Sequence, residues 1–534
     1  MEEERRGLKF TLPFLKKKQP IEVKLEPVTY APSPIPKGYR EIDRYPLYEP
    51  FAYAVIAENE DTGELLYVVD ELKLNEDEKE IYKKLIEVLE WELKPFEEPP
   101  KDPIDYFAKE AQKVINKYKI SLGRMANISW SKIIYYIERD LLGYGPIDPL
   151  MRDPYIEDIS CDGINKPVYV WHRNYESLPT TIVFTDEEEL DNFVIKLAHM
   201  AGKHISSAFP ILDAILPGQH RLAATFRKEV STTGSTFTIR KFREDPITII
   251  DLINFKTISP ELGAYFWLMM EYKMSSLVIG VTGSGKTSTI NALACLFRPT
   301  IKVVTIEDTA ELKIPLENWV PLVSRPSYGI GPEKVGEVTL YDLVRLSLRY
   351  RPDIIIVGEV RGEEAFVLFQ AIATGHGGIT SIHAEDLDSA IKRLTSPPMN
   401  IPPPYIPLVN IAFIIRRVSI PDPSTGTKKT VRRIVRVYEI KDFEDYIPIV
   451  EWNPIDDVHV HDFSKSILIP RISREAGIPI DQLLNEINTR AEVLSWMAKN
   501  KIRYYRDVAK IVHLYYAKPQ QVHEMVGEAI KGVT

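Results

Sequence analysis

The segment Gly280–Thr287 reads G-V-T-G-S-G-K-T and constrains the fold of this chain more than any other part of it. The apolar run Leu277–Ile279 precedes it and helix-forming residues follow it, and a glycine-rich turn between a strand and a helix is the context of a phosphate-binding loop. Gly283 and Gly285 let the backbone bend so that successive N–H groups point at phosphates, and the helix adds the positive end of its dipole. The segment therefore predicts a nucleotide-binding α/β domain.

Two side chains of this loop carry the chemistry of a nucleotide site. Lys286 is positioned to reach the β- and γ-phosphates, and the Thr287 hydroxyl is positioned to bind Mg²⁺. ATP and Mg²⁺ are therefore the predicted cofactors, with GTP as the alternative nucleotide. The predicted nucleotide-binding residues of the loop are Gly280, Thr282, Gly283, Ser284, Gly285, Lys286, Thr287 and Ser288.

The composition of the chain is that of an ordinary globular protein. Apolar residues make up 44% of its 534 residues and charged residues 27%, so about three domains with sizeable cores are expected. The net charge of −9 argues against a protein that coats nucleic acid, because that function needs a basic face, although a local basic channel would be compatible with it. Cys161 and Cys295 are too few for a disulfide framework or a cysteine-based zinc site, which fits a reducing compartment.

The sequence gives no sign of a membrane-spanning or secretory segment. Its richest apolar stretch, Ala264–Met270, is far shorter than the ~18 residues that a spanning helix needs. The charged N-terminus is not followed by a long apolar segment, as a secretory signal would require. We therefore expect a soluble, cytoplasmic protein whose membrane contact is peripheral, through partners or surface charge.

Turn clusters and changes of composition divide the chain into six segments. Residues 9–18 mix apolar and basic side chains, which indicates a flexible tail or a docking segment for an anionic membrane surface or an acidic partner. The predicted segments are a flexible basic and proline-rich stretch at 1–46, a small α/β unit at 47–103, an α+β N-terminal domain at 104–239, a linker at 240–247, the phosphate-loop domain at 248–431 and a strand and helical extension at 432–534.

Acidic residues close the strand that is predicted to follow the phosphate loop. The β-branched run 302–306 ends in Glu307, Asp308 and, three residues later, Glu311. Acids at the carboxyl end of a strand in such a sheet face the γ-phosphate, where one carboxylate can orient the attacking water and another can help hold the metal's water shell. A solvated turn after a core strand is the alternative.

A second acid closes the next predicted strand. Residues 354–357 are all apolar, which is typical of a parallel strand buried on both faces, and Glu359 follows them. Glu359 is then expected beside the Mg²⁺ site, as an outer-sphere ligand or a water-positioning base, unless it is a solvated acid at the end of a plain core strand. The predicted metal-site residues are Thr287, Asp308 and Glu359.

Arginines and histidines surround this acid. One of several arginines could neutralise the γ-phosphate from a neighbouring subunit, although surface ion pairing is the alternative for each: Arg325, Arg345, Arg349, Arg351 and Arg361. His376 and His383 flank a short glycine-bearing strand, which favours a γ-phosphate sensor over ordinary core or surface histidines.

Taken together, these motifs resemble the secretion ATPase superfamily of type II and type IV machines. That superfamily includes the pilus extension and retraction ATPases and the archaeal archaellum motor ATPase. The resemblance covers about 143–418 and includes the signature Gly145–Leu150 and the linker strand Phe237–Phe242. It implies a RecA-like phosphate-loop ATPase domain preceded by an α+β N-terminal domain, assembled as a homo-hexameric ring with ATP between the two domains.

The resemblance also implies roles for individual residues. Glu311 would be the carboxylate that activates water, Glu359 the acid on the metal side, and His376 and His383 the histidine box. Arginines at three N-terminal-domain or linker positions would approach the nucleotide: Arg221, Arg240 and Arg243.

Departures from the bacterial members make the chain similar to the archaeal branch. It lacks the four cysteines of the bacterial zinc module, and Thr309 stands where bacterial relatives commonly have proline. The long N-terminal unit and the segments Arg393–Pro398 and Arg436–Glu439 look like those of archaeal members. The expected function is that of a motor that powers the assembly of a filament of pilin-like subunits. In an archaellum, the same motor would also rotate the filament. Its expected partners are a polytopic membrane platform protein and accessory cytoplasmic motor proteins.

Other functions compete with this prediction. An ATPase of an archaeal secretion system would carry the same motifs. A nucleic-acid translocase on the same core is disfavoured by the negative charge, so no nucleic-acid partner is expected. A scaffold that binds nucleotide without hydrolysing it is disfavoured because every acid needed for turnover is present.

Overall fold

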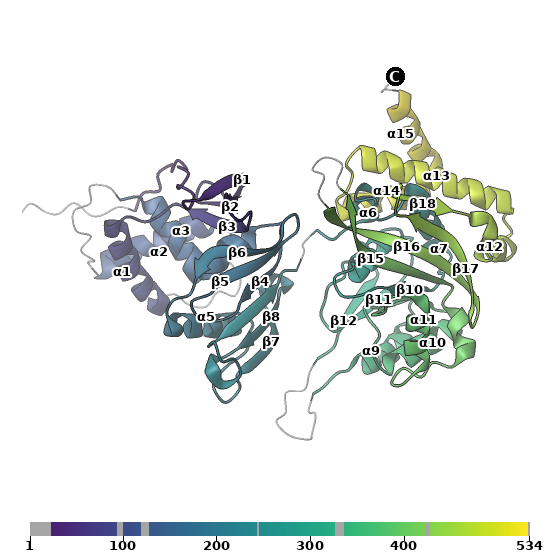
Figure 1. The fold of residues 1–534 in the computed structure, drawn as a ribbon, viewed down its shortest axis with the longest axis horizontal. Helices are drawn as coiled ribbons and strands as arrows, with labels where there is room; N and C mark the ends of the chain where they lie inside the picture. The colour runs from purple at the N-terminus through teal and green to yellow at the C-terminus, as the bar shows by residue number, and fades with distance from the viewer. Residues whose placement is uncertain are drawn as a thin grey trace, which may run out of the picture. The chain divides into compact units, whose positions relative to one another are not determined.

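The computed structural model describes residues 23–92, 100–118, 128–242, 245–325, 336–421 and 428–531. The basic segment 9–18 and Arg243 lie outside these residues. The chain divides into two compact units, 1–242 and 243–534, and each is described here by itself (Figure 1). Among the helices of the described residues, none is long and apolar enough to cross a membrane.

The first unit has an α+β fold built on one mixed sheet. The strand order of this sheet in the described residues is β1-β2-β3-β6-β5-β4-β9-β8-β7. Helices cover part of this sheet, and its apolar core lies between them (Figure 1). The strands are β1 (Tyr39–Tyr48), β2 (Ala52–Asn59), β3 (Leu65–Glu71), β4 (Ile156–Cys161), β5 (Pro167–His172), β6 (Glu176–Val183), β7 (Ile211–Ile215), β8 (Arg221–Thr225) and β9 (Thr236–Arg240). The helices are α1 (Glu76–Glu92), α2 (Pro103–Tyr118), α3 (Trp130–Leu141), α4 (Asp148–Arg152) and α5 (Glu187–Met200).

The start of the folded chain differs from the sequence prediction. The stretch up to 46 was expected to be irregular, yet β1 begins at Tyr39 and pairs antiparallel with β2. Its side chains are exposed or only half-buried, so it lacks the apolar alternation that marks a strand in a sequence. In addition, β3 pairs with β6 through Tyr67 and Thr180, so strands from both sides of the predicted boundary at 103 lie in one sheet.

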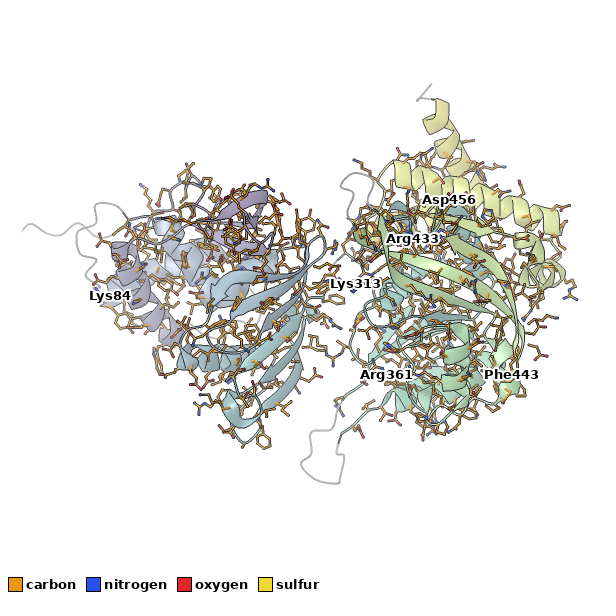
Figure 2. The ribbon with its side chains drawn as sticks, viewed as in Figure 1. Lys84, Lys313, Arg361, Arg433, Phe443 and Asp456 are labelled. Atoms are coloured by element: carbon orange, nitrogen blue, oxygen red, sulfur yellow. The ribbon has the colours of Figure 1, made fainter. Side chains whose placement is uncertain are left out.

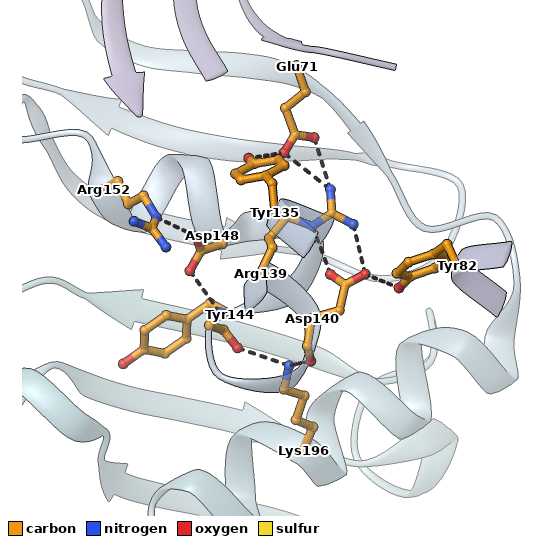
Figure 3. Close-up of polar contacts among 10 residues, drawn as sticks. Glu71, Tyr82, Tyr135, Arg139, Asp140, Tyr144, Asp148, Arg152 and Lys196 are labelled. Carbon is orange, nitrogen blue, oxygen red and sulfur yellow. Dashed lines mark hydrogen bonds and ion pairs between the residues drawn. The ribbon is translucent and has the colours of Figure 1, made fainter. Parts of the chain in front are cut away.

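A polar network joins the helices of the first unit to this sheet (Figure 3). Arg139 of α3 donates to both carboxylate oxygens of Glu71 at the end of β3, at 3.2 and 3.0 Å, and its Nε donates to Asp140 at 2.8 Å. Tyr82 of α1 donates to the same Asp140, and Lys196 of α5 donates to the Asp140 carbonyl at 2.6 Å. One guanidinium therefore links elements from both predicted N-terminal segments.

The turn after α3 depends on a glycine and an aspartate. The Asp148 carboxylate accepts the Tyr144 N–H at 2.9 Å and pairs with Arg152 at 2.5 Å (Figure 3). A Cβ at Gly143 would lie 2.8 Å from the Arg139 carbonyl oxygen, so a side chain cannot fit there without a shift of the backbone. This part of the sequence signature therefore has a clear structural role in the turn.

Replacing Arg139 with alanine is expected to destabilise the first unit by about 3 kcal/mol. Its side chain is 12% exposed, and its removal would leave two partly buried carboxylates, Glu71 and Asp140, without their cation. The exposed pair of Arg40 and Glu58 supplies the control, because an exposed ion pair contributes less than about 1 kcal/mol. Urea unfolding of Arg139→Ala and Arg40→Ala measures the difference, and equal midpoints would contradict the role of the network.

The second unit contains one sheet with the order β12-β11-β13-β14-β10-β15-β16-β17-β18 in the described residues. From β12 to β15 the neighbouring strands run parallel, and from β15 to β18 they run antiparallel. The parallel strands are β10 (Ser276–Ile279), β11 (Val303–Glu307), β12 (Trp319–Val323), β13 (Ile354–Val357), β14 (Gly377–Ile382) and β15 (Ile411–Pro421). The others are β16 (Lys428–Asp442), β17 (Asp445–Asn453) and β18 (Val458–His461).

Helices cover both faces of this sheet, so its central strands are buried on both sides (Figure 1). In β10, Val278 packs with one layer, and Leu277 and Ile279 pack with the other. The first layer holds α6 (Ile249–Asn254), α7 (Pro260–Glu271), α8 (Lys286–Ala294), α12 (Leu468–Ala476), α13 (Ile480–Lys499), α14 (Tyr505–Ala517) and α15 (Pro519–Lys531). The second holds α9 (Leu340–Ser347), α10 (Glu364–Ala373) and α11 (Leu387–Thr395). The predicted α/β fold class is confirmed.

The C-terminal helices pack on the same core as the phosphate loop. The buried Arg490 of α13 pairs with Glu271 at the end of α7. Tyr516 of α14 accepts the Trp267 indole N–H at 2.9 Å and donates to the Leu296 carbonyl, just after α8, at 3.3 Å. Strand β16 also crosses the predicted boundary at 431/432. The extension therefore supports the helix that follows the phosphate loop.

Candidate nucleotide-binding site

The candidate site lies at the edge where parallel strands of the second unit end. Ile279 at the end of β10 is in register with Ile382 at the end of β14, and Ile306 of β11 is in register with Val357 of β13. Because these strands are parallel, the residues after them meet at one edge of the sheet, where α/β folds bind their ligands. The topology thus gathers the phosphate loop, both acidic motifs and one histidine.

The phosphate loop has the backbone shape that its glycines predict. Gly283 has φ of 72° and Gly285 has φ of 103°, in the left-handed region that side chains disfavour. Gly285 is the N-cap of α8, so the helix starts at Lys286. The Lys286 amino group donates to the loop carbonyls of Gly280 at 2.9 Å and Val281 at 3.3 Å, and therefore lies across the loop.

Burial lowers the pKa of Lys286, and the nearby charges of Arg361 and Arg393 lower it further. The Glu359 carboxylate acts in the opposite direction on the same amino group. The half-buried Lys286 amino group is a suitable partner for a phosphate, because the negative charge of the phosphate would stabilise its charged form.

Arg361, labelled in Figure 2, is 66% exposed and forms an ion pair with Glu359 at 2.6 Å. The charge of Asp308 also acts on Arg361, so the two acidic motifs share one neighbourhood. Asp308 is exposed and accepts the Ser324 hydroxyl at 3.1 Å. Both acids are therefore available at the surface of the site.

Glu307 is buried, whereas Asp308 and Glu311 are exposed and Glu359 is half-buried. It is 5% exposed, and its Oε1 accepts the backbone N–H groups of Glu311 at 3.0 Å and Leu312 at 3.1 Å. Burial raises the pKa of Glu307 to about 7, against the effect of these two donors. The structure thus gives the predicted catalytic Glu307 a positioning role, because it fixes the segment that carries the exposed Glu311.

The Glu307→Gln variant is expected to be more stable than the wild type at pH 8 and equally stable at pH 4. A raised pKa means that the folded state holds its proton more tightly, so this stabilisation is complete below pH 4.5 and is lost as pH rises through about 7. The loss amounts to about 3 kcal/mol, and glutamine avoids it while keeping the acceptor oxygen. Thermal unfolding at the two pH values measures it, with the exposed Glu317→Gln as control. A difference that does not change with pH would contradict the buried, protonated carboxyl.

The two predicted histidines lie at opposite ends of β14. His383 follows the strand, and its Nδ1 lies 3.4 Å from the Thr282 hydroxyl of the phosphate loop. His376 precedes the strand, where its Nδ1 lies 3.0 Å from the Ala371 carbonyl oxygen. A strand of this length separates them by about 20 Å. The prediction that both histidines face the γ-phosphate is therefore wrong for a site within one subunit, because β14 runs between them from one edge of the sheet to the other.

Most of the clustered arginines lie away from the loop. Arg345 of α9 stacks over the Tyr341 ring at 5.6 Å, Arg349 lies in the turn after that helix, and Arg325 donates to the Gly336 carbonyl at 2.7 Å. Arg351 precedes β13, so it lies toward the edge opposite the loop. Of this predicted group, the structure brings Arg361 to the acids of the site.

Arg221 and Arg240 belong to the first unit, where they are cross-strand partners on β8 and β9. Each is exposed and forms an ion pair, Arg221 with Asp213 at 2.9 Å and Arg240 with Asp158 at 3.0 Å. These two arginines thus share one face of that sheet.

The donor set of the site fits a hydrated Mg²⁺ ion better than a directly bound metal. Thr287 on the first turn of α8, Glu359 and Asp308 offer the hard oxygen atoms that Mg²⁺ prefers. The described residues contain no group of three His, Cys, Asp or Glu side chains that could hold a metal by themselves. A phosphate ligand and water would therefore have to complete the coordination of the ion.

Two further arginines touch the site, and the sequence interpretation did not select them as site residues. Arg393 of α11 donates to the His383 carbonyl, and Arg432 of β16 donates to the Gly283 carbonyl at 3.2 Å. Arg432 lies 149 residues after Gly283, and the pairing of β10 with β15 and of β15 with β16 brings it there. A local sequence motif has no signal for such a contact.

Comparison with known proteins gives consistent matches. Residues 140–405 match the family described as type II/IV secretion system protein. The uncharacterized protein MJ0900 of Methanocaldococcus jannaschii is 35% identical over 481 residues, which cover 85% of this chain and 85% of that protein. The matched range of the family begins just before the turn at Gly143 and includes the phosphate loop, both acidic motifs and His383.

Two other matches concern type IV secretion. The type IV secretion system protein PtlH of Bordetella pertussis is 31% identical over 268 residues, which cover 45% of this chain and 76% of that protein. Among solved structures, the VirB11 ATPase of the Brucella suis type IV secretion system is 25% identical, covers 55% of this chain and 92% of that chain, and gives a TM-score of 0.27.

Proposed function

The chain belongs to the type II/IV secretion system protein family, and from this membership we propose that it is a hexameric ATPase that drives assembly of an archaellum or a type IV pilus-like filament. One observation supports the proposal of ATP hydrolysis: Lys286, Glu359 and the segment that contains Glu311 lie at the same edge of the sheet. The archaeal assignment is supported by the similarity to MJ0900 of Methanocaldococcus jannaschii.

Each residue of the edge has a defined part in the proposed reaction. Lys286 binds the β- and γ-phosphates, together with the N–H groups at the start of α8. Glu311 orients the attacking water and accepts its proton as the water oxygen bonds to the γ-phosphorus and the bond to the ADP oxygen breaks. His383 senses the γ-phosphate beside Thr282. Thr287, Asp308 and Glu359 would hold Mg²⁺ and its water shell, which would supply positive charge to the phosphate oxygens.

Completion of the site by a neighbouring subunit is the second part of the proposal. Arg345, Arg349 and Arg361 are exposed, so they can act on a nucleotide held by another copy. Arg221 and Arg240 of the first unit and Arg243 of the linker segment are proposed to approach the nucleotide. The ring would act in the cytoplasm on a polytopic membrane platform protein, with accessory motor proteins, and would touch the membrane only peripherally.

The test is to measure mass and ATPase rate together against protein concentration, with Mg-ATP present. A rate per subunit that rises as a hexamer forms is the expected result, because the neighbour supplies charge to the γ-phosphate. A monomer with full activity would exclude the shared site. Zero turnover in the assembled state would point to a nucleotide-binding scaffold.

Protein secretion is the second candidate, and the similarity to PtlH favours it. The same ring would then act on a secretion channel in place of a filament base. Deletion of the gene in its host, followed by electron microscopy of surface filaments and analysis of exported proteins, distinguishes the two: loss of filaments supports the filament motor, and loss of export with filaments intact supports secretion.

A further inference from the structure

A basic two-stranded ribbon reaches the phosphate loop from the antiparallel half of the sheet. Strand β15 pairs with β10 only over 411–414, and β15 and β16 then continue together to Pro421 and Lys428. The ribbon carries cationic residues on both strands: Arg416, Arg417, Lys428, Lys429, Arg432 and Arg433. Because the net charge of the chain is −9, this local concentration of positive charge runs against the overall balance.

Arg432 is the residue of this ribbon that contacts the phosphate loop. Its Nε donates to the Gly283 carbonyl at 3.2 Å. A Cβ placed on Gly285 would lie 3.3 Å from its Cδ and 3.7 Å from its Nε, so the Arg432 side chain lies directly against the turn that opens α8. The side chain is exposed, and in the described part of the chain no carboxylate pairs with it. Its two terminal nitrogens are therefore left for a ligand at the loop.

Two other arginines of β16 do pair with carboxylates. The buried Arg433, labelled in Figure 2, pairs with Asp457 at 2.7 Å, and the exposed Arg436 pairs with Glu451. Arg433 also donates to the main-chain oxygens of Phe255 and Arg432, whereas Arg432 donates to the Gly283 carbonyl of the phosphate loop. An uncompensated guanidinium is the group best suited to bind a phosphate.

The pairing register of the ribbon places a further charge beside it. Arg417 of β15 is directly opposite Arg432, so the two side chains share one face. The face of the ribbon that contacts the loop therefore carries two cationic side chains.

We propose that Arg432 is a nucleotide-binding residue that contacts the phosphates from within the same subunit. This inference rests on the proposed function, since it deepens the description of the same site. The matched family range ends at 405, so Arg432 lies in the part of the chain beyond it. The ligand recognised is the phosphate chain of a nucleoside diphosphate or triphosphate.

The test is calorimetric titration of ADP and of adenosine into the full-length Arg432→Gln variant. ADP is expected to bind about tenfold more weakly than to the wild type, because a charge-assisted contact is lost. Adenosine, which has no phosphate, should bind equally to both. The control is Arg436→Gln on the same strand, whose loss removes only an exposed ion pair and should leave ADP binding within about twofold.

The stability of the nucleotide-free variant separates ligand binding from a structural role. Because Arg432 is exposed, its replacement should leave the unfolding temperature of Arg432→Gln unchanged within about 1 °C. A lowered temperature with equal weakening of ADP and adenosine would overturn the proposal, as would ADP binding within about twofold of the wild type. If Lys286→Ala binds ADP weakly while Arg432→Gln binds it normally, only this inference fails. If the wild type binds no ADP, the proposed function fails with it.

Discussion

Replacing Lys286 with alanine is expected to abolish measurable ATP turnover, a loss of about 10³-fold or more. The Lys286 amino group lies across the loop, bonded to the carbonyls of Gly280 and Val281, and these are bonds that a phosphate oxygen can replace with a charged partner. Phosphoryl transfer depends on charge placed at the phosphates, and alanine removes it without a substitute. Steady-state ATPase assays and ADP titration on the same protein preparations measure the effect on turnover and on binding.

The control for this variant is Lys499→Ala, an exposed lysine in the last turn of α13. Both variants remove one positive charge, so a difference between them reports the position of the charge and not the net charge. Circular dichroism should show the same unfolding temperature for both, because Lys286 forms hydrogen bonds only within the loop in the described structure. Turnover within tenfold of the wild type in Lys286→Ala would remove this residue from the mechanism.

The parts of the site that the sequence predicts are those built from consecutive residues. The phosphate loop is one uninterrupted segment between β10 and α8, and its geometry follows from its own glycines. The acids after β11 and β13 were predicted because parallel strands must end at one edge, whatever their order in the sheet. In each case a local rule determines the position.

The parts that sequence reasoning missed depend on distances and burial that no local rule contains. His376 and His383 look like a pair in the sequence, but six strand residues carry them to opposite edges of the sheet. Glu307 looks like a catalytic acid, but the N–H groups of the following segment fold back onto it and bury it. Arg432 is brought to the loop only by the order of β10, β15 and β16. Such contacts are properties of the tertiary fold.

Replacing Glu311 with glutamine is expected to slow ATP hydrolysis by 10²- to 10⁴-fold while leaving ATP binding within about twofold. Glutamine keeps the size of the side chain and the backbone N–H that bonds to Glu307, so the segment keeps its position. It removes only the ability to take a proton from water. Single-turnover hydrolysis and equilibrium nucleotide binding separate the two effects.

The exposed Glu317→Gln, in the same segment, is the matched control and should turn over ATP at the wild-type rate. Comparison with Glu307→Gln assigns the roles of the two acids, because a positioning residue and a proton acceptor fail differently. Loss of the proton acceptor lowers the rate at every pH, whereas Glu307→Gln keeps the acceptor oxygen that holds the Glu311 segment and should retain most of the rate. Wild-type turnover in a pure Glu311→Gln preparation, together with a large loss in Glu307→Gln, would reverse this assignment and make the buried acid the base.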